Sequence, residues 1–126
     1  VQLTISQKFD VSGALIVTTP QELSLIDVKR GINMFRKVNL SILGLVENMS
    51  YYICNECKKK HYIFGKQSSL ELANNYDLDV LGELPISEDL IKKYDIQHPI
   101  IKQNQNDMIF KSFFDISQKI IRKIKI

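Results

Sequence analysis

The sequence contains no G-x-x-x-x-G-K-[ST] stretch, the glycine-rich loop whose backbone amides cradle phosphate groups. Its five glycines are isolated from one another, at positions 13, 31, 44, 65 and 82. No apolar run approaches the roughly 18 residues that a membrane-spanning helix needs. These absences exclude a phosphate cradle built from this chain alone, and they exclude a membrane span within it.

Cysteine is scarce, with only Cys54 and Cys57 in 126 residues. Two cysteines do not make a disulfide framework, and their C-x-x-C spacing favours a reducing compartment and a metal or redox role. The charge is also modest: 17 basic and 14 acidic residues leave a net +3, which is too little to indicate a nucleic-acid partner. Val1 is neither an initiator Met nor part of a charged signal-peptide region, so we expect the chain to start within a longer protein.

Short apolar runs alternate with helical stripes along the chain, which predicts an α/β protein with a doubly wound, mainly parallel sheet. The run 13–19 predicts a strand buried on both faces, and 42–48 and 80–85 predict two further strands. Helices are expected near the N-terminus (1–10) and over about 20–37, 68–76, 87–94 and 106–126.

Capping signals mark two of these helix starts. Thr19, Pro20 and Glu22 have the spacing of a capping box with proline at the first helical position. Ser68 and Glu71 repeat the box before the next helix. The apolar stripes of the second and last helices are Leu25, Val28, Ile32 and Phe35, and Ile109, Phe113, Ile116, Ile120 and Ile124.

In a doubly wound sheet, ligands bind beyond the carboxyl ends of the strands. Three segments are expected to meet at that edge: Thr18–Pro20, Glu47–Asn48 with the cysteine loop 50–65, and Pro85–Ile86. Asn48 carries an amide that can donate to and accept from a purine edge, although an asparagine that turns the chain is the simpler interpretation.

The C-x-x-C pair of Cys54 and Cys57 can hold one metal ion or cluster, but two thiolates supply only half of a coordination sphere. A zinc site would need His61 and a fourth ligand, whereas a second copy of the chain would place four cysteines across a dimer axis. By itself His61 is more typical of a solvated loop, and a redox dithiol or a pair of unremarkable thiols is a further interpretation. The basic run Lys58–Lys60 is expected to lower the thiol pKa values.

Five stretches of the sequence form a recognisable set: VQLTISQ, SGALIVTTPQ, DVKRGINMF, LGLVENMSYYIC and LGELPI. Together they closely resemble the Mrp/ApbC family, P-loop ATPases of the MinD/ParA-like branch that carry iron–sulfur clusters. The similarity covers about residues 1–101, and beyond that point the chain matches only in being helical.

This resemblance implies the C-terminal portion of a single P-loop NTPase domain, residues 1–126, whose Walker A half would lie upstream. It implies a homodimer that binds ATP with magnesium and a [4Fe–4S] cluster bridged between subunits, with Cys54 and Cys57 as the ligands. Asn48 would read adenine, and Pro85 and Ile86 would form part of the base pocket.

We therefore expect the C-terminal part of an ATPase that binds an iron–sulfur cluster and passes it to apoproteins, in the cytoplasm or in the mitochondrial matrix. This chain alone is expected neither to hydrolyse ATP nor to bind it tightly. One alternative is a MinD/ParA-like positioning ATPase that uses its basic terminal helix on a membrane or DNA. The other is an interaction module stabilised by zinc on Cys54, Cys57 and His61. Asn55 replaces the proline that the family usually has after the first cysteine, which would loosen the loop without removing a ligand.

Overall fold

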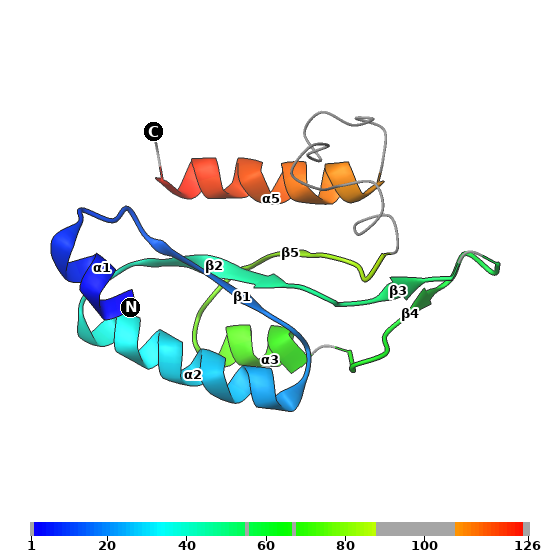
Figure 1. Ribbon diagram of the computed structural model, residues 1–126, viewed down its shortest axis with the longest axis horizontal. Helices are drawn as coiled ribbons and strands as arrows, with labels where there is room; N and C mark the ends of the chain where they lie inside the picture. Colours follow the sequence, from blue (N-terminus) through cyan, green and yellow to red (C-terminus); the bar gives the residue numbers. More distant parts are fainter. Residues whose placement is uncertain (1, 55, 67, 88–107, 125–126) are drawn as a thin grey trace.

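A three-stranded parallel sheet forms the centre of the molecule in the computed structural model, which describes residues 2–54, 56–66, 68–87 and 108–124. The strand order is β1-β2-β5, with β1 at Ala14–Thr18, β2 at Ile42–Glu47 and β5 at Val80–Glu83. Helices α2 (Glu22–Lys37) and α3 (Ser68–Asn75) lie on one face, and α5 (Met108–Ile124) lies on the other (Figure 1). The short helix α1 (Gln2–Lys8) precedes β1. The predicted α/β architecture with a C-terminal helix is therefore confirmed.

The core consists of two apolar clusters, one on each face of the sheet. Because β2 is the central strand and successive side chains of a strand point to opposite faces, the adjacent residues Leu45 and Val46 are buried in opposite clusters. The cluster on the side of α2 and α3 is Ile16, Val28, Ile32, Leu45 and Leu72, and the cluster under α5 is Val46, Leu81, Leu84 and Ile116.

Strand β1 departs from the sequence expectation of burial on both faces. Ile16 is buried, but Leu15 and Val17 are 37% and 57% exposed. The reason is that β1 lies at the edge of the described sheet, while α5 packs against β5 and β2. The apolar run correctly predicted the strand but not how much of it the described helices cover.

The predicted start of α2 is wrong by two residues. The helix begins at Glu22 with Gln21 as its N-cap, and no side chain caps it. Thr19 lies in the turn after β1, where its hydroxyl oxygen is 2.7 Å from the Ser24 hydroxyl oxygen. The helix predicted at 87–94 lies outside the described residues, apart from Ser87, whereas the terminal helix is confirmed as α5.

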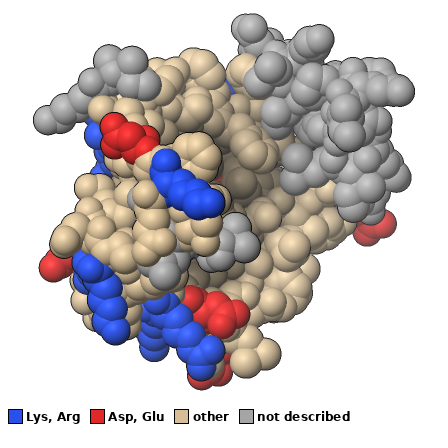
Figure 2. All heavy atoms as spheres, turned by 60° about the vertical axis from the view of Figure 1, so that its left-hand side comes forward, with Lys and Arg blue, Asp and Glu red and all other residues tan. Residues whose placement is uncertain are grey.

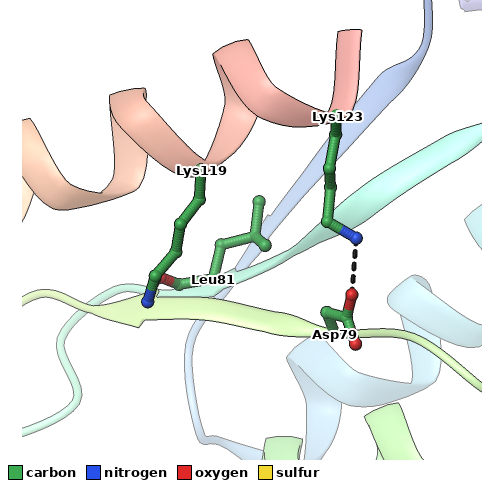
Figure 3. A network of polar contacts seen from close by, with 4 residues as sticks. All are labelled: Asp79, Leu81, Lys119 and Lys123. Atoms are coloured by element: carbon green, nitrogen blue, oxygen red, sulfur yellow. Dashed lines mark hydrogen bonds and ion pairs between the residues drawn. The ribbon is translucent and has the colours of Figure 1, made fainter. Parts of the chain in front are cut away.

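Two lysines of α5 contact β5 and the residue that precedes it, as Figure 3 shows. Lys119 Nζ donates to the Leu81 carbonyl oxygen at 3.0 Å, and Lys123 Nζ forms an ion pair with Asp79. The predicted stripe on this helix is confirmed in Ile109 and Ile116, which are buried, but Phe113 on the same stripe is 38% exposed. None of the described helices is both long and apolar enough to cross a membrane.

Candidate functional site

The carboxyl ends of the three parallel strands meet at one edge, as the sequence predicted. The Asn48 backbone N–H donates to the Thr18 carbonyl oxygen at 2.6 Å, which joins the ends of β2 and β1. The Leu84 N–H donates to the Glu47 carbonyl oxygen at 2.8 Å, which joins the ends of β5 and β2. Backbone hydrogen bonds therefore join the three predicted segments at this edge.

The chain leaving β2 then runs beside the chain leaving β5. The Ser50 N–H donates to the Leu84 carbonyl oxygen at 2.9 Å, and the Ile86 N–H donates to the Tyr51 carbonyl oxygen at 2.7 Å. Tyr52 and Ile86 form an isolated parallel bridge. The Pro85–Ile86 segment thus lies directly alongside the start of the cysteine loop.

Asn48 makes a turn at this edge. Its side-chain Oδ1 accepts a hydrogen bond from the Met49 N–H at 2.9 Å, and Met49 takes a positive φ of 54°. This contact matches the chain-turning role that the sequence offered as the simpler interpretation. The half-buried Asn48 also borders a groove of about 490 Å³ formed mainly by β1 and α2. Base reading by Asn48, Pro85 and Ile86 stays a prediction.

The cysteine loop is a small hairpin, with antiparallel strands β3 (Tyr52–Ile53) and β4 (Lys60–His61). It projects from the body of the molecule beyond the end of the sheet (Figure 1). At its tip the Lys58 N–H donates to the Cys54 carbonyl oxygen at 2.8 Å, and the Cys54 N–H donates to the Lys59 carbonyl oxygen at 3.2 Å. The sequence indicated a loop here but not these two short strands.

The tip brings three potential metal ligands together. The ligand atoms of Cys54, Cys57 and His61 all lie within 4.8 Å of one another. Cys57 Sγ and His61 Nε2 are 3.5 Å apart, and both residues are exposed. The structure therefore places His61 beside the thiols, where the sequence alone favoured a solvated loop histidine.

The backbone of the turn lowers the pKa of the Cys54 thiol. The backbone N–H of Cys57 contributes most, followed by that of Glu56 and then by the Cys57 side chain, because each can stabilise the thiolate. The charge of Lys58 also lowers the pKa of Cys54, as the sequence predicted, but it is the smallest of these contributions. A thiolate is the form that binds metals, so this turn favours the reactive form.

A buried polar group behind the edge was not found from the sequence. Glu47 is only 3% exposed although it carries a carboxyl group, and burial raises its pKa. The hydroxyls of Ser50 and Ser69 lie near enough to oppose part of this rise, yet neither makes a hydrogen bond within the described part of the chain. The one available signal was an acidic residue at the end of an otherwise apolar strand.

A parallel sheet with helices on both faces, and a hairpin with a thiol pair beyond the carboxyl ends of its strands, is typical of the doubly wound class of α/β proteins. The model of the ParA family described as "NUBPL iron-transfer P-loop NTPase" matches residues 1–121. The chain therefore belongs to this family of P-loop NTPases.

Relatives with curated names agree with this assignment. The chain is 41% identical to an iron-sulfur cluster carrier protein of Aquifex aeolicus over 99% of this chain and 34% of the relative. It is also 41% identical to the iron-sulfur cluster transfer protein NUBPL of Mus musculus, over 99% of this chain and 39% of the relative. The chain thus spans between a third and two fifths of the length of these proteins.

Solved structures show the same fold. A nucleotide-binding protein of Archaeoglobus fulgidus, described in complex with ADP and with Co, has a TM-score of 0.67 at 35% identity, over 89% of this chain and 44% of that one. The cell-division ATPase MinD of Pyrococcus furiosus has a TM-score of 0.65 at 19% identity, over 88% of this chain and 43% of that one. At this lower identity the likeness to MinD shows the fold alone.

Proposed function

We propose that this chain is the cluster-binding part of an iron–sulfur carrier, which holds its cargo through Cys54 and Cys57 and passes it to apoproteins. The observation that carries the proposal is the placement of both thiols at the tip of a projecting hairpin, with ligand atoms within 4.8 Å. The names of the relatives, a cluster carrier and a cluster transfer protein, support the same cargo.

The donor set fits a cluster shared between two copies of the chain. A [4Fe–4S] cluster is usually held by four thiolates, and one chain offers two. Because Cys57 is exposed and the hairpin projects, a second hairpin could approach without displacing the core. We therefore propose a homodimer in which Cys54 and Cys57 of each copy bind one bridging cluster.

Transfer then requires ligand exchange and no covalent intermediate on the protein. Thiolates of an acceptor would replace Cys54 and Cys57 one at a time, since thiolates are the ligands of both donor and acceptor. The lowered pKa of Cys54 helps to release the cluster as well as to bind it, because a less basic thiolate is a better leaving ligand.

In the whole protein, ATP with magnesium would bind at the carboxyl edge of the sheet, with Asn48, Pro85 and Ile86 near the base. The Ile86 N–H donates to the Tyr51 carbonyl oxygen, so a nucleotide that moves the β5 exit segment would also move the base of the hairpin. Nucleotide state could thereby gate loading or release of the cluster.

Cluster transfer to an apoprotein tests this proposal. The chain is loaded with iron and sulfide without oxygen and mixed with an apo-acceptor for a [4Fe–4S] cluster, whose activity reports arrival. We expect transfer from the wild type and from Lys59→Ala, a control exposed on the same hairpin, but not from Cys57→Ala. An acceptor filled no faster than by free iron and sulfide would contradict carriage.

The positioning ATPase has less support. On the face shown in Figure 2, basic and acidic side chains are interspersed, so this face offers no broad basic patch for DNA. On α5, Lys119 and Lys123 are engaged with β5, which takes two basic groups away from any membrane surface.

A further inference from the structure

The cysteine hairpin and the turn that follows it, residues 50–66, carry the whole net charge of the chain. This segment contains four of the 17 basic residues and one of the 14 acidic residues, so its net charge is +3. The charged residues are Lys58, Lys59, Lys60, Lys66 and Glu56. The 13 basic and 13 acidic residues of the remaining chain cancel. Because the hairpin projects from the body (Figure 1), its positive field reaches solvent at one end of the molecule.

Two of these lysines are held in place by a pair of tyrosines at the base of the hairpin. The ring centroids of Tyr51 and Tyr62 are 6.0 Å apart. Lys60 Nζ lies 4.5 Å from the centroid of the Tyr51 ring, and Lys66 Nζ lies 5.0 Å from that of Tyr62. Tyr51 is only 5% exposed, so the pair is anchored in the body of the molecule. These cation–π contacts restrain both ammonium groups, and restrained groups lose less freedom when a partner binds.

The charges of the lysines remain open to a partner. All four lysines are exposed, and no carboxylate of the described residues forms an ion pair with any of them. Lys58 is the lysine whose charge lowers the pKa of the Cys54 thiol. Lys60 and Lys66 lie over the tyrosine rings instead, which leaves their charges for an external anion.

Exposed apolar side chains lie in the same segment. Ile63 is 60% exposed and Phe64 is 36% exposed, and both lie between the two restrained lysines in the sequence. Apolar contacts surrounded by polar and charged groups are typical of protein–protein interfaces. DNA or RNA would instead require a broad basic surface, whereas the charges outside the hairpin segment cancel. The segment therefore favours an acidic protein over a nucleic acid.

We propose that the segment 60–66 is a docking surface for an acidic face of the acceptor apoprotein. Lys60 and Lys66 face carboxylates of the acceptor, and Ile63 and Phe64 pack on its apolar side chains. This inference rests on the proposed carrier function and adds the chemistry of the partner to it. Opposite charges speed the encounter of the two proteins. Because the segment runs from β4 back toward the body, it leaves the thiols at the tip to exchange the cargo.

Association with an acidic apo-ferredoxin tests this surface. The ferredoxin carries a fluorophore, and its ligand cysteines are replaced by serine so that no cluster can move. We expect its association rate constant with the whole chain to fall at least about 10-fold between about 50 and 300 mM salt, because salt screens the steering charges. Lys60→Gln/Lys66→Gln should associate about 10-fold more slowly than the wild type at the lower salt concentration and should depend less on salt.

Two matched variants serve as controls. Lys37→Gln/Lys111→Gln removes the same charge from exposed positions on α2 and α5, and it should stay close to the wild-type rate. Lys60→Arg/Lys66→Arg keeps both the charge and the stacking on the tyrosine rings, so it should also stay close to the wild type. A ferredoxin whose surface Asp and Glu are replaced by Asn and Gln should associate slowly with every variant.

Equal rates for the wild type and Lys60→Gln/Lys66→Gln at the lower salt concentration would overturn the proposal. Displacement of the ferredoxin by an equal concentration of single-stranded DNA would also overturn it. Cluster transfer to the unmodified apo-ferredoxin separates this inference from the proposed function. Transfer that fails while docking keeps its dependence on salt and on the two lysines counts against the carrier function alone. Transfer that salt and both lysines leave unchanged counts against the docking surface alone.

Discussion

Glu47 is a buried carboxyl group at the carboxyl edge of the sheet, with only 3% of its surface exposed. Desolvation is the largest cause of its raised pKa, and the nearby Glu83 carboxylate adds to it. The buried hydroxyls of Ser50 and Ser69 have no hydrogen-bond partner in the part of the chain that the structure describes. Ionisation of Glu47 should therefore lower the free energy of unfolding, because a buried charge is unfavourable unless hydrogen bonds or an opposite charge compensate it.

Replacing Glu47 by glutamine should therefore change how stability depends on pH. The pKa of Glu47 in the fold exceeds its ordinary value of 4.5, so the folded state favours the protonated carboxyl group. Its contribution to folding stability is therefore fully present below that ordinary value, and it is lost as the pH rises through the folded-state pKa. We expect Glu47→Gln to be more stable than the wild type at about pH 7 and nearly equal at about pH 4. Urea midpoints across this range measure the effect.

Glu56→Gln makes the same substitution at an exposed position of the hairpin tip and serves as the matched control. A Glu47→Gln protein that is less stable than the wild type at every pH would show instead that the carboxylate is a favourable group, for example at the start of α3.

At the scale of elements, the close approach of α5 to β5 depends on one glycine. A Cβ atom added at Gly82 would lie 2.5 Å from Ile116 Cγ1 and 2.8 Å from Ile116 Cδ1. Ile116 is buried in the cluster with Val46, Leu81 and Leu84. The absence of a side chain at position 82 thus lets the terminal helix reach the sheet.

Gly82→Ala should destabilise the fold by about 1–3 kcal/mol, the usual effect of overpacking a core. Gly31→Ala is a matched control, because a Cβ there meets no atom within 4 Å in the interior of α2. That change should stabilise the fold by about 0.5–1 kcal/mol. Chemical denaturation measures both, and the same sign for the two variants would contradict this view of the contact.

The sequence predicted elements best where local pattern and tertiary burial agree. The apolar run of β2 and the stripe of α2 gave the right elements, because both faces of β2 and one face of α2 are covered. The sequence failed where tertiary context decides: Thr19 bonds to Ser24 instead of capping α2, and Val17 stays exposed at the sheet edge.

For the site, the C-x-x-C spacing identified Cys54 and Cys57. The rule that ligands bind beyond the carboxyl ends of parallel strands identified the neighbouring edge of the sheet. The spacing C-x-x-C-x-x-x-H raised His61 as a candidate ligand, but the sequence favoured a solvated loop histidine, because the nearness of His61 to Cys57 depends on the antiparallel pairing of two-residue strands. Burial of Glu47 also depends on packing between β2 and the start of α3, which no local pattern reports.

At the scale of the whole molecule, the chain has the carboxyl edge of a P-loop NTPase sheet but no glycine-rich phosphate loop in its sequence. The relatives named above are between two and three times longer. We therefore expect the purified chain to show no ATP turnover above a blank and no tight ATP binding. A phosphate-release assay and isothermal titration check this, and sustained turnover by the pure chain would contradict it.

The most direct test of the central claim is assembly of the cluster itself. The chain is reconstituted with iron and sulfide without oxygen, and iron, acid-labile sulfide, zinc and the mass in solution are measured together for the wild type and for Cys54→Ala. The account predicts about four iron and four sulfide per dimer in the wild type, lost together with the dimer in the variant. Iron and sulfide retained by Cys54→Ala, or bound by a wild-type monomer at that stoichiometry, would contradict a cluster bridged by these two cysteines.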